Sequence, residues 1–457
     1  MPGLTRVDGI LDDRPDRERG CDHDRGPDDD GGWDFDAVVV GASLAGCATA
    51  IMLGRAGARV ALVEQRPDAR AFKRICSHYI QASAVGTLER MGLLEPMLAQ
   101  GAVRSRGHVW TRWGWIEPQA DSRVPAGVNL RRERLDPLIR AIAAETPGVE
   151  LMLGKAVGEL VRDGDAVRGV RARAADGRTL TLRAPLVVGA DGRDSRVAKL
   201  AQVRTKVVPH GRFVYGGYFE GPPPERAPDA QLWLLDPHMG AAFPTDRGLT
   251  LYAVMPTKDL LGQFRADPVT ALTDFIAALP EAPPILGSRL IEPLQGKLDM
   301  TNVAHAVTAP GLALVGDAAL AIDPLWGVGC GWAFQSAEWL ADSVAPALLD
   351  GGRSRAGRLA RGLRRYRRRH ALQLRGHAML IYDYASGRKF SPGERFLFSA
   401  AARDERVART FEAFGARSIG PARMFASTLP RAALGNLRHR RCGPGDGRSG
   451  AVQAGSV

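Results

Sequence analysis

Residues 36–64 read DAVVVGASLAGCATAIMLGRAGARVALVE. The apolar run Ala37–Val40 predicts a buried parallel strand, and a helical segment begins at Leu44, just after a glycine turn. A second apolar run then ends at Glu64, 23 residues after Gly41. Strand, turn, helix, strand and acid follow one another as in a parallel β-α-β unit, which predicts an α/β fold.

The turn GASLAG has the spacing of a phosphate-binding loop. Gly41 permits the tight turn, and Gly46 allows the helix and the strand to approach closely. Ser43 stands where a second glycine is usual. The first helical turn, with Leu44 and Ala45, directs free backbone N–H groups toward the place that a pyrophosphate would take.

An acid follows the second strand at the position that suits a ribose. Glu64, with Gln65 after it, is placed to accept hydrogen bonds from ribose hydroxyls, and an acid there disfavours a 2′-phosphate. Together with the turn, these residues predict a bound dinucleotide. The alternative is an ordinary β-α-β unit that binds no nucleotide.

Two later stretches also place a carboxylate at the end of an apolar strand. LVVGADGRDS (186–195) places Asp191 there, and LALVGDAALAIDPLWGVGCGWAFQSAE (312–338) places Gly316 and Asp317 there. Such a carboxylate can bind the hydroxyls of a nucleotide or fix a turn that faces a phosphate.

Glycines follow the last of these acids and precede a helix. After Pro324 come Gly327, Val328, Gly329 and Cys330. Repeated glycines beside a helix N-terminus let a flat ring lie against the backbone. The positive end of the helix dipole would stabilise negative charge on the N1–C2=O edge of a reduced flavin.

These three motifs together resemble the FAD-dependent aromatic hydroxylases, the group typified by para-hydroxybenzoate hydroxylase, over about residues 36–345. The last motif and KRICSHYIQASAVGTLERMGL (73–93) also resemble geranylgeranyl-reductase-type flavoproteins. The resemblance implies a Rossmann-like FAD-binding domain with a parallel sheet, an antiparallel-sheet substrate domain and C-terminal helices. It also implies FAD as the cofactor and NAD(P)H as a cosubstrate.

The resemblance also implies roles for single residues. Gly316 and Asp317 would meet the ribityl and pyrophosphate region of FAD, and Gly329 and its neighbours would line the isoalloxazine. Asp191 would support the FAD region and its reduction by NAD(P)H. In VNLRRERLD (128–136), Arg132 matches the arginine that contacts FAD in the family. Arg131, one position earlier, is the alternative.

Candidates for a catalytic role are His78 and Tyr79, in the loop after the second strand, and Trp326, in the turn beside the expected ring. A structural hydrogen bond for His78 and ordinary packing for Trp326 are the alternatives. Cys76 is a candidate too, against the alternative of a small buried residue.

The segment with Phe243 and Pro244 resembles the active-site mouth of the family's substrate domain, with His238 and Met239 as candidates for the pocket lining. The stretch WGWIEP (113–118) is similar to a signature of flavin-dependent halogenases, but in a different order and place. Lys73 is the only lysine near the expected ring that could form a haloamine. The alternative is that these tryptophans line or roof the substrate pocket.

Composition predicts several segments along the chain. Both tails are rich in Arg and Gly and poor in apolar residues, which predicts disorder. In residues 204–302, alternating strands split by Pro-rich turns predict an antiparallel sheet. We predict disordered tails at 1–33 and 436–457, an FAD-binding domain from 34–103, 125–203 and 303–345, a substrate domain from 104–124 and 204–302, and a C-terminal helical region at 346–435.

The formal charge of +12 does not indicate a nucleic-acid partner, because seven lysines among 62 basic residues point to an arginine bias of the whole chain. The densest run, 353–370, predicts a helix with a solvated basic face. No apolar run is long enough for a transmembrane helix, and the first residues lack the apolar core of a secretory signal. The five cysteines show no metal or disulfide spacing, so we expect no metal and a reducing, cytoplasmic location.

The resemblance to the aromatic hydroxylases implies an FAD-dependent monooxygenase, which we expect to act in secondary metabolism. It would use NAD(P)H and O2 to oxygenate a hydrophobic or aromatic small molecule through a C4a-hydroperoxyflavin. The alternatives are an ene-reductase of the geranylgeranyl-reductase kind, a flavin-dependent halogenase, and a non-catalytic flavoprotein that binds a partner or carries electrons.

Overall fold

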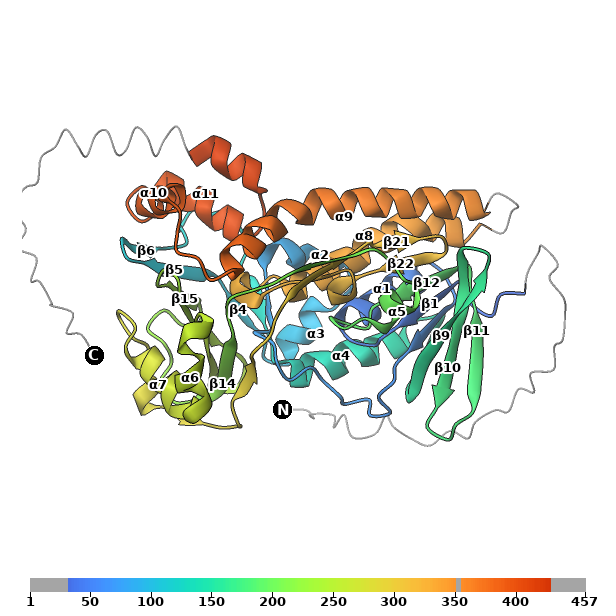
Figure 1. Cartoon of the computed structure of the whole chain (residues 1–457), viewed down its shortest axis with the longest axis horizontal. Helices are drawn as coiled ribbons and strands as arrows, with labels where there is room; N and C mark the ends of the chain where they lie inside the picture. Colours follow the sequence, from blue (N-terminus) through green and yellow to red (C-terminus); the bar gives the residue numbers. More distant parts are fainter. Residues whose placement is uncertain (1–31, 351–354, 429–457) are drawn as a thin grey trace, which may run out of the picture. The chain divides into compact units, whose positions relative to one another are not determined.

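The computed structural model describes residues 32–350 and 355–428 (Figure 1). The predicted disordered tails at 1–33 and 436–457 lie outside the described residues, apart from Gly32 and Trp33. Within the described residues, two large sheets and a set of long helices make up the fold.

A mostly parallel sheet forms the core of the first half of the fold. Its strand order is β21-β22-β12-β1-β2-β8, and only the pairing of β21 with β22 is antiparallel. The central strands are buried along their whole length, in a hydrophobic core that they share with helices and with strands of a smaller sheet. The strands are β1 (Ala37–Val40), β2 (Val60–Val63), β8 (Val149–Met152), β12 (Leu186–Gly189), β21 (Thr308–Ala309) and β22 (Leu312–Leu314).

Helix α1 (Leu44–Arg55) begins where the sequence predicts and packs against α4 (Arg132–Glu145) and α8 (Gly329–Leu348). Its glycines and alanines allow this close packing on several sides, and ten of its residues are buried. Figure 1 shows α9 (Arg355–Ala385) running alongside α8, with which it is in contact. Short helices α2 (Val85–Arg90), α3 (Leu94–Ala99) and α5 (Arg196–Leu200) complete this half.

The second large sheet is mostly antiparallel, in the order β18-β14-β17-β16-β15-β5-β6, with β19 on β14. The pairing of β5 with β15 is parallel, so the predicted antiparallel sheet contains one exception. Helices α6 (Leu261–Ala266) and α7 (Pro268–Ala277) supply Phe264, Leu272 and Ile276 to its core. The strands are β5 (Gly107–Thr111), β6 (Gly114–Ile116), β14 (Val214–Glu220), β15 (Ala230–Leu234), β16 (Met239–Pro244), β17 (Leu249–Val254), β18 (Arg289–Leu290) and β19 (Gln295–Lys297).

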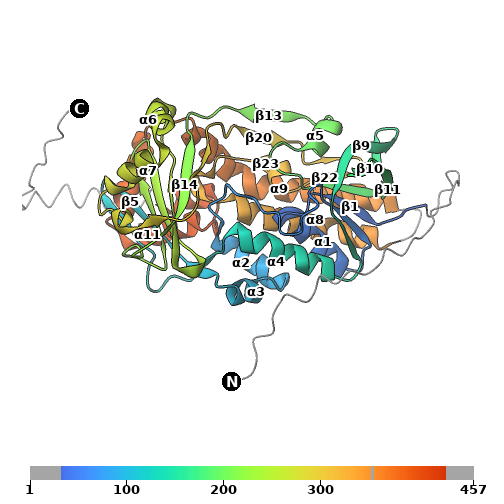
Figure 2. The ribbon, with the colours of Figure 1, turned by 90° about the horizontal axis from the view of Figure 1, so that it is seen from below.

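Three small sheets lie between or beside the large ones. The turns DGDA and ADGR join the three strands of an antiparallel meander. Figure 2 shows β13 and β20 side by side where the chain passes between the two large sheets. The small sheets comprise β9 (Lys155–Asp163), β10 (Ala166–Ala174) and β11 (Thr179–Arg183); β13 (Thr205–Val208), β20 (Asn302–His305) and β23 (Leu320–Ala321); and β3 (Tyr79–Ile80), β4 (Val103–Ser105) and β7 (Gly127–Asn129).

The described part of the C-terminal region is helical, with α10 (Pro392–Ala401) and α11 (Glu405–Gly415) after α9. The arginines Arg361, Arg364 and Arg368 of α9 are exposed, so the described part of the predicted run, 355–370, forms a helix with a solvated basic face. The predicted fold class is therefore confirmed, whereas the division of the chain into domains stays a prediction.

Candidate FAD-binding and substrate site

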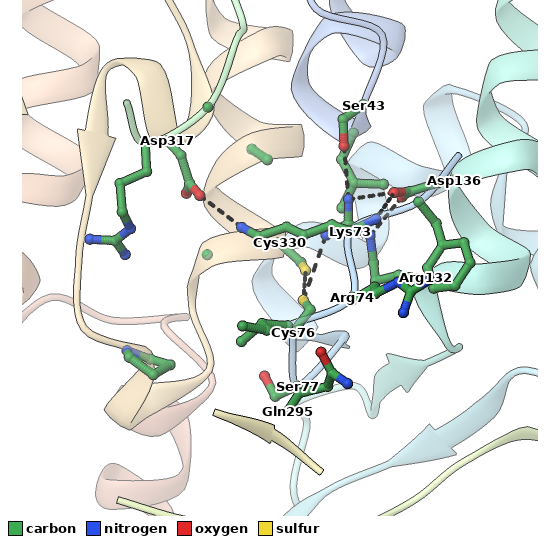
Figure 3. A pocket seen from close by; sticks show the side chains of 18 of the residues that line it. Ser43, Lys73, Arg74, Cys76, Ser77, Arg132, Asp136, Gln295, Asp317 and Cys330 are labelled. Atoms are coloured by element: carbon green, nitrogen blue, oxygen red, sulfur yellow. Dashed lines mark hydrogen bonds and ion pairs between the residues drawn. The ribbon is translucent and has the colours of Figure 1, made fainter. Parts of the chain in front are cut away.

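One cavity of about 1450 Å³ brings the three sequence motifs together (Figure 3). Gly41, Asp191 and Asp317, one from each motif, all line it, although they come from three distant parts of the chain, and Gly329 of the last motif lines it too. The predicted cofactor residues that line it are Gly41, Ser43, Leu44, Ala45, Glu64, Gln65, Arg132, Asp191, Asp317, Pro324, Gly327, Gly329 and Cys330; Gly46, Gly316 and Val328 lie behind this lining.

The glycine turn has no room for side chains. Gly41 has a φ of +103°, and a Cβ there would lie 2.6 Å from the carbonyl oxygen of Ala190. A Cβ at Gly46 would lie 1.7 Å from the carbonyl oxygen of Gly41. The turn can therefore press its backbone against a ligand, while Gly46 serves the packing beneath it.

The acid after β2 holds this turn in place. Glu64 accepts a hydrogen bond of 2.9 Å from the N–H of Ala42 and one of 3.0 Å from the N–H of Arg66. Ser43 is the N-cap of α1 but makes no side-chain capping bond. The first N–H groups of α1 therefore have no partner within the helix and point toward the cavity end of the turn.

Both arginines of the RR pair line the cavity, with different partners. Arg132 forms a bidentate pair with buried Asp136, with distances of 2.6 and 2.9 Å, and donates to Ser43 Oγ at 2.8 Å. Arg131 pairs instead with Asp246 and lies 5.5 Å from the centre of the Tyr218 ring. Of the two, Arg132 is the one that contacts the glycine turn. This contact favours Arg132 over Arg131 as the arginine that would contact FAD.

Arg140 is a residue that sequence reasoning missed. It lies one helical turn beyond Asp136 on the same face of α4 and donates to the carbonyl oxygen of Ala42 at 3.1 Å. The same guanidinium binds the carbonyl groups of Ala69 and Ala71. The spacing of Arg132, Asp136 and Arg140 at four-residue intervals is the signal that could have found it.

Asp317 has a cationic partner in this structure. Lys73 Nζ lies 3.0 Å from Asp317 Oδ2, and the backbone N–H of Lys73 donates to Asp136 at 3.0 Å. The attraction of Asp317 raises the pKa of Lys73. Burial favours the neutral form of Asp317, but Lys73 and Arg193 outweigh it, and its pKa is lowered. Nothing in the sequence pattern pairs these residues, because Lys73 lies in an irregular loop.

The acid of the mid-chain motif has its oxygens bound within the protein. Asp191 accepts a 2.6 Å hydrogen bond from Ser195 Oγ and one of 2.9 Å from the N–H of Val197 at the start of α5. Asp191 lines the cavity, and these two hydrogen bonds use its carboxylate to fix the turn between β12 and α5. The next arginine, Arg193, donates to the carbonyl oxygens of Thr301 and Ile322.

The glycines after Asp317 lead into the N-terminus of α8. Gly327 has a φ of +58° and ends the short turn Pro324–Trp326, and Gly329 is exposed at the first position of the helix. Asp323 is buried; its side chain accepts from the N–H of Leu325 at 3.0 Å. Burial raises the pKa of Asp323 to about 6.

Of the four catalytic candidates, Cys76 lines the cavity, whereas His78, Tyr79 and Trp326 do not. His78 is fully buried, and its Nδ1 lies 3.1 Å from the hydroxyl of Tyr218, which does line it. Burial lowers the pKa of His78 to about 3. Tyr79 donates to the carbonyl of Ser105 at 3.2 Å, and the Trp326 ring packs 5.3 Å from that of Phe414.

The antiparallel sheet supplies an apolar wall to the same cavity. Met239 and Phe243 line it as the sequence suggests, whereas His238 and Pro244 do not. His238 accepts instead from the N–H of Thr257. The other residues of this wall are Val214, Gly216, Gly217, Leu251, Ala253 and Met255.

The tryptophans of WGWIEP do not line or roof the cavity. Trp115 donates to Glu281 at 2.8 Å, and the Arg226 guanidinium lies 3.9 Å from its ring centre. Among the described residues, no group of His, Cys, Asp and Glu could hold a metal ion, and no helix is long and apolar enough to cross a membrane.

Comparison with known proteins assigns the family. Residues 34–360 match the family model of the FAD binding domain. The chain belongs to this family. It is therefore a flavoprotein and an FAD-dependent oxidoreductase. Its fit to FAD rests on two features described above: the side-chain-free turn at Gly41 and the free N–H groups at the start of α1.

Relatives of this flavoprotein have different activities. Kynurenine 3-monooxygenase from Salinispora tropica is 30% identical over 328 residues, which cover 65% of this chain and 70% of that protein. Digeranylgeranylglycerophospholipid reductase 1 from Methanococcoides burtonii is 26% identical over 331 residues, covering 69% and 75%. The flavin-dependent brominase Bmp2 has a similar fold, with a TM-score of 0.70 at 17% identity, covering 89% of this chain and 99% of that one.

Proposed function

We propose that this flavoprotein is a monooxygenase, which uses NAD(P)H and O2 to insert one oxygen atom into a hydrophobic or aromatic small molecule. The observation that carries the proposal is the continuity of one cavity. Its polar end offers backbone amides and charged groups, and its other wall is apolar. The similarity to a kynurenine 3-monooxygenase supports oxygen insertion as the reaction.

We assign the FAD contacts by the position of each residue in the cavity. The amides of Ser43, Leu44 and Ala45 would hold the pyrophosphate, with Arg132 beside them, and Asp317 would hold a ribityl hydroxyl. When bound, FAD supplies electrons taken from NAD(P)H and the activation of O2. The further contacts we propose are Glu64 and Gln65 with the ribose of the adenosine, and Pro324, Gly327, Gly329 and Cys330 with the ring; all of these residues line the cavity.

The chain's own groups provide electrostatic stabilisation and exclude water. The N-terminus of α8 and the Lys73 ammonium would stabilise negative charge that develops beside Gly329. The apolar wall keeps water away from the reacting atoms.

His78 stays neutral at ordinary pH, and we propose that it positions the Tyr218 hydroxyl in the cavity wall rather than exchanging protons itself. Tyr79 and Trp326 would support the wall from behind.

The similarity to a digeranylgeranylglycerophospholipid reductase favours a second candidate, an FAD-dependent ene-reductase. The same apolar wall could bind a polyene. The halogenase alternative has weaker support, because Lys73, the lysine that the sequence suggests for a haloamine, is paired with Asp317 at 3.0 Å.

A direct test measures NADH and NADPH oxidation and O2 uptake by the FAD-loaded protein across a panel of aromatic and polyene compounds. The monooxygenase proposal expects substrate-stimulated O2 uptake and one ¹⁸O atom from ¹⁸O2 in the product by mass spectrometry. Saturation of a double bond under anaerobic conditions would establish the reductase instead. A halide-dependent product would establish the halogenase.

A further inference from the structure

Two cysteines meet in the cavity wall. Cys76 Sγ and Cys330 Sγ lie 3.5 Å apart, and both residues line the cavity, although 254 positions separate them in the chain (Figure 3). Cys47, the third cysteine among the described residues, is buried in the core and does not line the cavity.

The surroundings of Cys76 stabilise a thiolate. Its sulfur accepts from the N–H of His78 at 3.2 Å, and Arg132 Nη1 lies 3.6 Å away. The hydrogen bond from Cys330 and the charges of Arg132 and Lys73 outweigh burial and hold the pKa of Cys76 well below its usual range. The hydrogen bond with Cys76 and burial raise the pKa of Cys330. The hydrogen bond from His78 and the nearby guanidinium of Arg132 thus favour a thiolate at Cys76 beside a thiol at Cys330, the arrangement in which a reactive cysteine has a resolving partner.

The backbone around the two sulfurs can close the remaining gap. A disulfide needs sulfurs about 2.05 Å apart, so they must approach by about 1.5 Å. Cys76 lies in an irregular loop between β2 and β3, whereas Cys330 is fixed in the first turn of α8. Movement of the loop alone would bring the sulfurs together.

We propose that Cys76 and Cys330 form a reversible thiol–disulfide redox pair that responds to hydrogen peroxide. The Cys76 thiolate attacks one oxygen of the peroxide, the O–O bond breaks, and the leaving hydroxide takes a proton to become water. The resulting Cys76 sulfenic acid is attacked by the Cys330 sulfur, an S–S bond forms, and the hydroxyl leaves as a second water. In sum, two thiols lose two electrons and two protons, and one peroxide becomes two waters.

The disulfide would tie the loop of Lys73 and Cys76 to the start of α8, within the cavity wall. It would also remove the negative charge beside Arg132. The inference goes beyond the proposed function and does not depend on it, because peroxide is added from outside and no substrate turnover is needed.

The test uses the full chain. The protein is exposed to hydrogen peroxide, treated with catalase, blocked with N-ethylmaleimide and digested without reductant for peptide mass spectrometry. We expect one peptide that links Cys76 to Cys330 within a single molecule, lost after dithiothreitol. The proposal is overturned if both cysteines stay labelled with N-ethylmaleimide, or if Cys76 pairs only with Cys21, Cys442 or a second molecule.

Variants separate the attacking sulfur from the resolving one. Cys76→Ser should abolish the linked peptide, and Cys330→Ser should leave a Cys76 sulfenic acid that dimedone traps. Cys47→Ala is the matched control, which removes a thiol but should form the link as the wild type does. Far-UV circular dichroism checks the fold of each variant, and the wild-type link decides the question if a variant does not fold. A dimedone adduct on Cys330 rather than Cys76 would refute the assigned roles.

Discussion

The two sides of the cavity are built on different principles. One, which we call the cradle side, consists of Gly41, Ser43, Glu64, Arg132 and Asp317, and it offers amides and charges at the ends of parallel strands. The other, the sheet side, offers side chains that lie on the antiparallel strands β14, β16 and β17 or directly after β17. The residues of the sheet side are Val214, Met239, Phe243, Leu251, Ala253 and Met255.

The difference follows from how the two kinds of sheet expose their atoms. Strand ends leave backbone groups and helix N-termini free, which suits the phosphates and hydroxyls of a dinucleotide. The face of an antiparallel sheet presents alternate side chains and few free polar groups, which suits an apolar substrate. We therefore expect changes on the cradle side to alter FAD retention and changes on the sheet side to alter substrate use.

The largest effect is expected at Arg132. Arg132→Met leaves the carboxylate of Asp136 buried without its bidentate partner, and breaking a buried pair costs about 3–5 kcal/mol in the free energy of unfolding. FAD retention should fall with it. Urea unfolding followed by circular dichroism measures the loss.

The double variant Arg132→Met, Asp136→Asn should recover most of that stability without recovering FAD retention, because the buried charge is gone but the guanidinium is not restored. Equal losses of unfolding free energy in the single and double variants would contradict the buried pair, and full FAD retention in either variant would contradict the assignment of Arg132 to the cradle side.

Gly41→Ala should weaken FAD binding by roughly a thousandfold, about 4 kcal/mol. The added Cβ meets the backbone oxygen of Ala190 at 2.6 Å, and the residue must hold a φ of +103°. Flavin fluorescence quenching measures the dissociation constant.

Gly57→Ala is the matched control for this variant. Gly57 has a φ of +100° in the same β-α-β unit, its Cβ would meet nothing closer than 3.7 Å, and it does not line the cavity. The Gly57→Ala variant should lose stability through backbone strain, but its dissociation constant for FAD should stay that of the wild type. If both glycine variants lost FAD alike, strain rather than the cradle would explain the effect.

Asp323 is an acid that lines the cavity on the cofactor side. Its Oδ2 lies 3.8 Å from Nδ1 of His210, a residue that shortly precedes β14 of the sheet side. The pKa of Asp323 is raised to about 6 in the folded protein, so the native state binds its proton more tightly than the unfolded state does. The free energy of unfolding should therefore fall as pH rises from about 4 to 6, by about 3 kcal/mol from this group.

Buried His78, whose pKa is lowered to about 3, contributes a slope of the opposite sign, since stability from it rises as pH rises toward 6.5. The difference between the wild type and Asp323→Asn isolates the carboxyl. Urea titrations at several pH values should show that the variant loses the downward slope. Parallel pH profiles for both proteins would contradict the raised pKa.

The smallest effect is expected on the sheet side. Ala253→Leu adds apolar volume to the cavity wall, and we expect KM for the substrate to change by roughly tenfold, the size of effect that one or two methylene groups produce. The dissociation constant of FAD should not change, which is the internal control. A loss of FAD in this variant would show that the two sides are not separate.

Sequence reasoning predicted the cradle side better than the rest. Gly41, Asp317 and Gly329 follow strands or precede helices, and the ends of parallel strands meet at one edge, so their convergence could be predicted. The pairs Lys73–Asp317 and Cys76–Cys330 could not, because a loop without periodicity gives no register.

His78 shows the same limit. Its φ of +46° and its burial behind Tyr218 are set by tertiary packing, and an isolated His in a loop does not reveal them. The parallel pairing of β5 with β15 also escaped prediction, since a strand inserted from a distant part of the chain carries no signal for its direction.

The interleaving of the two large sheets has a consequence for synthesis on the ribosome. The β5–β6 hairpin ends at Ile116, but β15, the strand that pairs with β5, begins only at Ala230. The parallel sheet is likewise incomplete until β22, which begins at Leu312, has been synthesised. At translation rates of about 5–20 residues per second, the hairpin edge stays uncovered for roughly 6–23 seconds. Neither sheet can close before about two thirds of the chain has emerged, so nascent chains stalled before that point should be captured by chaperones or degraded.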